Sequence, residues 1–257
     1  MITRNDITAW GIEHPWPETD QVEQDLLLSQ AICVIADDSF LKDELALRGG
    51  TAFHKLLLPE PYRYSEDLDY VRTTEGGIGK VMRRLTDIGS ELGYSVNTKM
   101  GMFPKVIWKF TSASGLPGKI KIEINTQERK PIHGFYFADY HVDSPYYSGN
   151  AKVRTFISEE LTATKIRALY QRSKGRDLYD LWLAIKILSL DKAVILDTFE
   201  AYRPEGLTGK EIVSNLRTKL SDRQFTEDVA NMIRHDAPEY DPQSAGNFII
   251  EELLESL

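Results

Sequence analysis

Three carboxylates in two short segments are the residues of this sequence best placed to do chemistry. Asp67 and Asp69 are two apart in a segment with strand character, and Glu123 alternates with isoleucines in another. A β-strand turns successive side chains to opposite faces, so Asp67 and Asp69 share a face. If the two strands are neighbours, the three carboxylates converge, and a cation must offset their repulsion. Mg²⁺ is the usual cation for such oxygen ligands.

A glycine turn upstream of these acids could hold a phosphate group. Gly49 and Gly50 precede Thr51, where a short helix is expected to begin. Backbone N–H groups at such a turn bind phosphate, and glycine lets the backbone approach closely. We therefore expect Gly49, Gly50 and Thr51 to bind the nucleotide, together with Ser65, where an added phosphate would repel the metals.

These features together predict metal-dependent transfer from a nucleoside triphosphate (NTP). Asp67 and Asp69 would hold one or two Mg²⁺ ions, and Glu123 would complete the second site or accept the proton of the attacking hydroxyl. Taken singly, each feature is also typical of ordinary structure: an exposed acidic strand, a plain turn, or the solvent side of an amphipathic sheet. Their order and spacing favour the chemical interpretation.

Composition limits the class of protein. The chain has 257 residues, 42% of them apolar, which allows one large core or two modest ones. It has no apolar run of about eighteen residues and no apolar signal-peptide region near Met1, so we expect no membrane partner. The single cysteine, Cys33, lies in an apolar run and is expected in the core. A cytoplasmic location fits these features.

The net charge of −8 argues against a general nucleic-acid binder, yet the basic residues are clustered. Candidate RNA-binding residues in one helical segment are Arg167, Arg172, Lys174 and Arg176, close to Lys165. Lysines also populate the strand region, at Lys99, Lys105, Lys109, Lys119 and Lys121. A locally basic surface in an acidic protein suits a polyanionic substrate, whereas a solvated helix face is the alternative for the helical cluster.

Hydrophobic spacing and turn residues predict mixed elements in the first part of the chain. Helices are expected at about 19–36, 40–47, 51–58 and 78–92. Strands are expected at about 63–71, 94–99, 105–111, 119–126 and 135–140. The acidic segments therefore lie on strands, and the glycine turn opens a helix.

From about residue 155 the pattern is helical, with helices expected at 158–172, 177–188 and 192–202. A boundary near residue 150 would separate a core of residues 1–150, with N-terminal helices, from a helical domain of residues 151–257. The predicted fold class is α+β, a mixed sheet flanked by helices and followed by an α-helical domain.

Three segments of the sequence resemble the abortive-infection AbiEii/AbiGii nucleotidyltransferase toxins, which belong to the DNA polymerase β-like nucleotidyltransferase superfamily. They are Leu47–Leu56 around the glycine turn, Tyr62–Asp69 with the aspartate pair, and Leu161–Trp182 with the basic cluster. The resemblance covers roughly residues 20–190 and extends to the MenT-type tRNA nucleotidyltransferase toxins. It implies a polymerase β-like fold.

The resemblance also implies roles for individual residues. Gly49, Gly50 and Thr51 match the glycine motif, and Asp67 and Asp69 match the metal-binding acids. The match supports the assignment of the aspartate pair to metal and of the glycine turn to the NTP.

Further roles fall on the later motif and on the third carboxylate. Lys165 matches a lysine that contacts the triphosphate, and Asp177 matches a further catalytic acid, so that the helical domain would contribute to the active site. Asp177 is equally typical of a charge at a helix N-terminus. Glu123 stands where the superfamily has its third carboxylate, a position that is less uniform among these toxins.

The function implied by the resemblance is that of a toxin neutralised by a cognate antitoxin. Some relatives add nucleotides to the 3′ acceptor end of tRNA, so we expect transfer of a nucleoside monophosphate from an NTP to tRNA or another RNA end, blocking translation and growth. The alternatives are transfer to a protein hydroxyl or a small molecule, or a non-catalytic binding module. The sequence does not identify the NTP, the acceptor or the oligomeric state.

Overall fold

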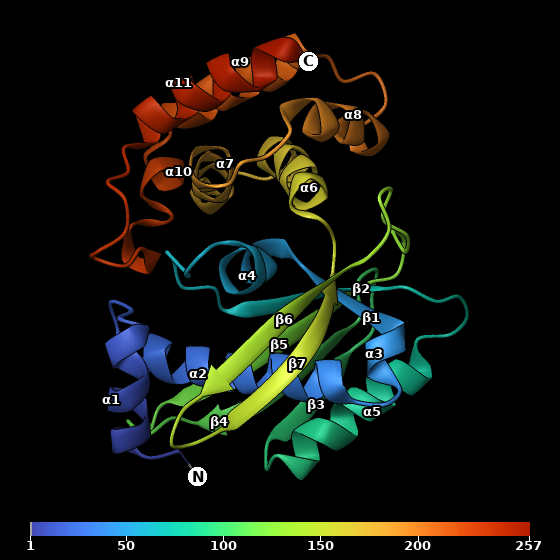
Figure 1. Cartoon of the computed structure of the whole chain (residues 1–257), viewed down its shortest axis with the longest axis vertical. Helices are drawn as coiled ribbons and strands as arrows, with labels where there is room; N and C mark the ends of the chain where they lie inside the picture. Colours follow the sequence, from blue (N-terminus) through green and yellow to red (C-terminus); the bar gives the residue numbers. More distant parts are fainter. Residues whose placement is uncertain (1) are drawn as a thin grey trace. The chain divides into compact units, whose positions relative to one another are not determined.

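The computed structural model describes residues 2–257, and the chain divides into two compact units, the first ending at Phe156 and the second spanning Ile157–Leu257 (Figure 1). The first unit contains α1 (Arg4–Glu13), α2 (Thr19–Asp37), α3 (Leu41–Glu44), β1 (Leu45–Arg48), α4 (Gly49–Ala52), the π-helical turn η1 (Phe53–Leu57), β2 (Asp67–Arg72), α5 (Gly79–Glu91), β3 (Ser95–Lys99), β4 (Lys105–Thr111), β5 (Pro117–Asn125), β6 (Tyr136–Asp143) and β7 (Ser148–Thr155).

The second unit is entirely helical among its described elements. It contains α6 (Ser158–Gln171), α7 (Gly175–Ile187), α8 (Lys192–Tyr202), α9 (Gly209–Leu220), α10 (Arg223–Glu227), η2 (Ala230–Met232), α11 (Pro242–Glu252) and η3 (Leu254–Ser256). None of the described helices is long and apolar enough to cross a membrane.

A five-stranded mixed sheet with the strand order β1-β2-β5-β4-β3 forms the centre of the first unit. β2 pairs with β5 in parallel, while the other neighbours are antiparallel. β6 and β7 form a separate two-stranded ribbon (Figure 1). The α+β class expected from the sequence, with a mixed sheet flanked by helices and followed in the chain by a helical domain, is confirmed.

One face of the sheet is apolar and packs on helices. Alternation along β5 buries Ile120, Ile122 and Ile124 on this face, and Trp108 of β4 is also fully buried there. The Trp108 indole donates a hydrogen bond of 2.9 Å to the Leu85 carbonyl oxygen of α5, so a polar group inside the core is satisfied. The opposite face therefore carries the polar side chains of the same strands.

The single cysteine is part of the core, as expected. Cys33 lies on α2, most of whose residues are buried, and its side chain is 2% exposed. Burial raises the pKa of the thiol to about 11, which leaves it protonated at neutral pH.

Several expected elements differ from the structure. The helix expected at 40–47 ends at Glu44, and Leu45–Arg48 forms β1 instead, because antiparallel pairing with β2 overrides the local helix preference. The strand expected from residue 63 begins only at Asp67. β7 occupies Ser148–Thr155, where no strand was expected, so the unit that it completes ends at Phe156.

Candidate active site

The register of the central strands places the acids on one face. Asp67 lies opposite Lys121 of β5, and Asp69 lies opposite Glu123. Side chains at paired positions of neighbouring strands point to the same face. Asp69 also lies opposite Arg48 of β1 on its other side. The three carboxylates expected to act together therefore share one face of two adjacent strands.

Two of these carboxylates are engaged by lysines. Lys121 Nζ lies 2.5 Å from Asp67 Oδ2, and Lys105 Nζ lies 2.8 Å from Glu123 Oε2. Partial burial alone would lower the pKa of Lys121. The hydrogen bond to Asp67 and the charges of Asp67, Glu123 and Asp69 outweigh burial, so that pKa lies above its ordinary value. Lys121 thus lies within the field of all three acids and serves as their cation.

The three carboxylates are the right kind of ligand for a hard divalent cation, although their present arrangement does not form a metal site. Among residues 2–257, no three His, Cys, Asp or Glu side chains are grouped closely enough to hold a metal ion. Carboxylate oxygens on rigid neighbouring strands are nevertheless the ligands that Mg²⁺ prefers. A metal bound by Asp67 and Asp69 would have to replace the ammonium group of Lys121.

Gly49 gives the backbone its close approach to Asp69. Its φ of +79° lies in the left-handed region, and a Cβ atom added at this position would lie 2.6 Å from Asp69 Oδ2. Only glycine meets both conditions without strain. The α4 helix begins at Gly49 itself, two residues earlier than the helix start expected from the sequence.

The hydroxyl of Thr51 is used inside the fold. It donates a hydrogen bond of 2.5 Å to the carbonyl oxygen of Asp67 and lies 2.8 Å from Ser65 Oγ. Thr51 is 1% exposed, whereas Ser65 is half-buried. Thr51 therefore fixes the start of β2, and its hydroxyl is already engaged within the fold.

We predict that Gly49→Ala abolishes most transfer activity. The added methyl group must displace the Asp69 carboxylate, and the left-handed backbone adds about 1–2 kcal/mol of strain. Gly76→Ala is the matched control, because Gly76 also has a positive φ, of +95°, but open space around its Cβ position. Equal activity of the two variants, measured with labelled NTP alongside thermal melting, would contradict this assignment.

The second unit holds a separate, buried charge network. Lys165 Nζ of α6 lies 3.1 Å from Asp177 Oδ1 and 2.7 Å from Asp180 Oδ2, both on α7. Arg172 forms a two-pronged contact with Asp177, at 2.6 and 2.8 Å. The Lys165 side chain is 5% exposed and both aspartates are fully buried. The shared helix faces follow from sequence spacing, but the burial does not.

The charges around Asp177 keep it ionised. Burial would raise the pKa of Asp177, but the Lys165 charge and the hydrogen bond from Arg172 outweigh it and hold that pKa below its ordinary value. Lys219 of α9 adds a helix cap that the sequence did not indicate. Its Nζ donates to the carbonyl oxygens of Leu169, Tyr170 and Arg172 at the end of α6.

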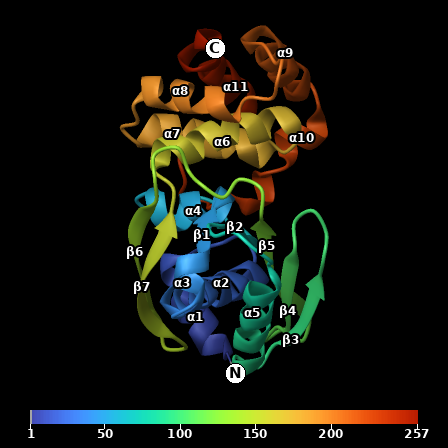
Figure 2. The same ribbon diagram turned by 90° about the vertical axis from the view of Figure 1, so that its right-hand side faces the viewer.

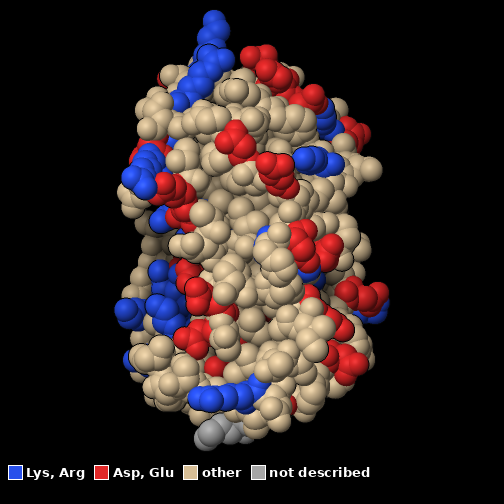
Figure 3. Space-filling view, turned by 90° about the vertical axis from the view of Figure 1, so that its left-hand side faces the viewer, with Lys and Arg blue, Asp and Glu red and all other residues tan. Residues whose placement is uncertain are grey.

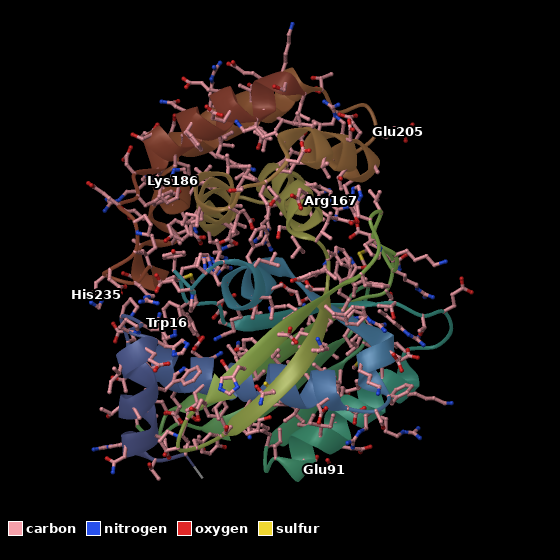
Figure 4. All side chains as sticks on the ribbon, in the orientation of Figure 1. Trp16, Glu91, Arg167, Lys186, Glu205 and His235 are labelled. Carbon is pink, nitrogen blue, oxygen red and sulfur yellow. The ribbon has the colours of Figure 1, made fainter. Side chains whose placement is uncertain are left out.

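The other basic residues of the helical segment also have partners in this unit. Lys174 Nζ lies 3.6 Å from Asp228 Oδ1, and the backbone N–H of Arg176 donates a hydrogen bond of 3.2 Å to Asp228 Oδ2. Arg167 projects from α6, and its guanidinium lies 5.3 Å from the ring centre of Tyr202 (Figure 4). These contacts give part of the basic cluster a structural role. An RNA-binding role for the cluster stays a prediction.

Comparison with known proteins gives the family. Residues 32–247 match the model of the nucleotidyl transferase AbiEii toxin of type IV toxin–antitoxin systems. No curated protein matches the chain in sequence. Among solved structures, MenT4, a nucleotidyltransferase toxin from Mycobacterium tuberculosis, superimposes with a TM-score of 0.68 at 14% identity, covering 100% of this chain and 91% of that one.

A second solved structure shares the fold at greater distance. It is an antigenic nucleotidyltransferase-like protein from Paracoccidioides brasiliensis, with a TM-score of 0.50 and 17% identity over 80% of this chain and 94% of that one. The family match implies an NTP as substrate and an antitoxin as partner. The chain belongs to the AbiEii nucleotidyltransferase toxin family, and it is a nucleotidyltransferase.

Proposed function

We propose that this enzyme transfers a nucleoside monophosphate from an NTP to the 3′ end of an RNA, with the acceptor end of tRNA as the foremost candidate, and thereby blocks translation and growth. The observation that carries the proposal is the position of Lys121 within the field of Asp67, Asp69 and Glu123. Three carboxylates that already attract lysine ammonium groups, next to a glycine turn, suit a metal–triphosphate complex.

Asp67 and Asp69 would hold one or two Mg²⁺ ions, which neutralise phosphate charge and hold the attacking and leaving oxygens in line. Lys121, released from Asp67, would turn to the phosphates. Glu123, whose carboxylate contacts Lys105, would accept the proton of the attacking hydroxyl. The backbone of Gly50 and Thr51, with Ser65 beside it, would receive the β- and γ-phosphates.

For the second unit we propose that the primary role of Lys165 and Asp177 is to stabilise the fold. Their buried ion pair joins α6 to α7, and Arg172 closes the network at the surface. Asp177 then orients Lys165, and the triphosphate contact inferred for Lys165 from the resemblance would require it to leave this pair.

The deciding experiment incubates the protein with Mg²⁺, total RNA and each of the four NTPs labelled at the α-phosphate. We expect label in a tRNA-sized band with one preferred nucleotide, and none with Asp67→Ala. Label on the protein or on a small molecule, with none on RNA, would overturn the RNA acceptor and favour the alternative acceptors.

A further inference from the structure

Five lysines lie on the same sheet face as the three acids. They are Lys99 of β3, Lys105 and Lys109 of β4, and Lys119 and Lys121 of β5. The three strands lie side by side at one end of the sheet, with α5 beside them (Figure 2). Because α5 packs on the apolar face through Leu85 and Trp108, the lysine face is the side of these strands that it leaves uncovered.

Two pairs of these lysines stand directly opposite each other. Lys109 is registered with Lys119, and Lys99 is registered with Lys105. Like charges at opposite positions of neighbouring strands destabilise a sheet. Among residues 2–257, no acidic side chain lies within ion-pair distance of Lys99, Lys109 or Lys119, and all three are exposed. Lys105 has Glu123 as its partner, whereas the repulsion between Lys109 and Lys119 is not offset by any acid in the described part of the chain.

General basicity does not explain the cluster, since the chain carries a net charge of −8. Figure 3 shows a face of the molecule on which basic and acidic side chains are mixed. A ligand with several negative charges would turn the repulsion between the paired lysines into attraction. A single small anion would satisfy only one pair.

The strand register places these lysines in the same rows across the sheet as the acids, or in adjacent rows. One row across the sheet runs Lys99, Lys105, Glu123, Asp69, and the next runs through Lys121 to Asp67. Neighbouring strands are about 4.8 Å apart, so Lys105 lies roughly 10 Å from Asp69. Lys119 is two residues before Lys121 on β5. A chain of phosphates on the lysines would thus end at the carboxylates.

We propose that the lysine face of β3, β4 and β5 holds the phosphate backbone of the acceptor RNA beside its reacting 3′ end. This assignment rests on the proposed transfer to RNA and names the surface that serves it. Lysine ammonium groups act as point charges without base readout, so the contact positions the strand but does not select its sequence.

The test replaces Lys109 and Lys119 by glutamine in the full chain. The matched control is Lys42→Gln with Lys80→Gln, which removes the same charge from exposed positions on α3 and α5. Binding of a fluorescent RNA hairpin with a single-stranded 3′ end is measured by anisotropy across a salt series without NTP. Transfer kinetics and thermal melting are measured in parallel.

We expect Lys109→Gln/Lys119→Gln to bind RNA about tenfold more weakly at physiological salt, with a salt slope lower by roughly 0.7 for each lysine removed. The KM for RNA should rise by a similar factor while the KM for NTP and kcat stay within about twofold. The melting temperature should not fall, because the repulsion is relieved.

The outcomes separate the two proposals. If wild type labels RNA and the double variant binds RNA as the control does, the lysine face is refuted and the proposed function stands. If wild type labels no RNA, the function fails and this assignment fails with it. A double variant that loses binding only to an acidic protein, and not to RNA, would also overturn the assignment and make this face a protein-docking surface.

Discussion

Replacing Asp69 by asparagine is expected to reduce nucleotide transfer about a thousandfold or more while the fold stays intact. Asp69 lies between Arg48 and Glu123 in the register, and a Cβ atom added at Gly49 would lie 2.6 Å from its carboxylate. An amide in this position has the same shape but cannot neutralise a divalent cation, and groups that stabilise transition-state charge contribute factors of this size.

The stability of Asp69→Asn should stay within about 1 kcal/mol of wild type. The substitution removes one of two like charges at opposite positions, Asp69 and Glu123, which offsets the loss of attraction to Arg48. Chemical unfolding followed by circular dichroism measures this quantity, and labelled NTP measures transfer.

Asp139→Asn is the matched control. Like Asp69, which lies opposite Arg48, Asp139 lies opposite a cation on a neighbouring strand, with Lys152 Nζ at 3.0 Å. It lies on the β6–β7 ribbon, however, and is 84% exposed. We expect the control to keep full activity. An Asp69→Asn protein that folds and retains more than a tenth of the wild-type rate would remove Asp69 from the metal site.

Glu123→Gln completes the series. If Glu123 is the proton acceptor or third metal ligand, its loss should also be severe. If Lys105 and Glu123 form only a surface ion pair, the loss of transfer should be small.

The acidic strands could be predicted because alternation is a local property. Ile120, Ile122 and Ile124 mark the buried face of β5, and the residues between them must lie on the other. That prediction only assumed that β2 and β5 are neighbouring strands. It depends on long-range pairing, which no local pattern encodes.

The missed elements share a physical cause. Leu45–Arg48 has ordinary helix formers and becomes a strand only through its pairing with β2. Ser148–Thr155 begins with residues of low strand propensity and is held by β6. Tertiary context decides both segments.

The cations of the site were the least predictable part. The spacing of Lys119, Lys121 and Glu123 placed them on one face, but the opposition of Lys109 to Lys119 appears only once the register is known. In the same way, seven-residue spacing placed Lys165 and Arg172 together, whereas the burial of their partner Asp177 depends on how α6 packs on α7.

That burial leads to the second large effect, the loss of stability in Asp177→Ala. Removing the carboxylate leaves Lys165 and Arg172 without the acid between them, and Lys165 is 5% exposed. Breaking a buried ion pair by removing one partner costs roughly 3–5 kcal/mol, because a buried charge remains uncompensated. Asp180 still contacts Lys165 and keeps the cost from rising further.

Asp228→Ala is the control in the same unit. Asp228 also faces two cations, Lys174 and Arg176, but Lys174 is 43% exposed and its charge stays solvated when the acid is removed. Its ion pairs should contribute about 1 kcal/mol or less, and the hydrogen bond that it accepts from the backbone N–H of Arg176 about 1 kcal/mol more. The excess loss of stability in Asp177→Ala over Asp228→Ala, measured by urea unfolding, reports the effect of burial.

The pH dependence gives an independent check on Asp177. Its pKa in the folded chain lies below the ordinary value, so the unfolded chain binds more protons in acid. Its contribution to stability is therefore complete above the pKa of an unfolded aspartate and is lost as pH falls through the lowered folded value. The wild-type minus Asp177→Ala difference in unfolding free energy should shrink across that acidic window. If Asp177→Ala instead unfolds like wild type at every pH and loses only transfer, Asp177 acts on the substrate and not through Lys165.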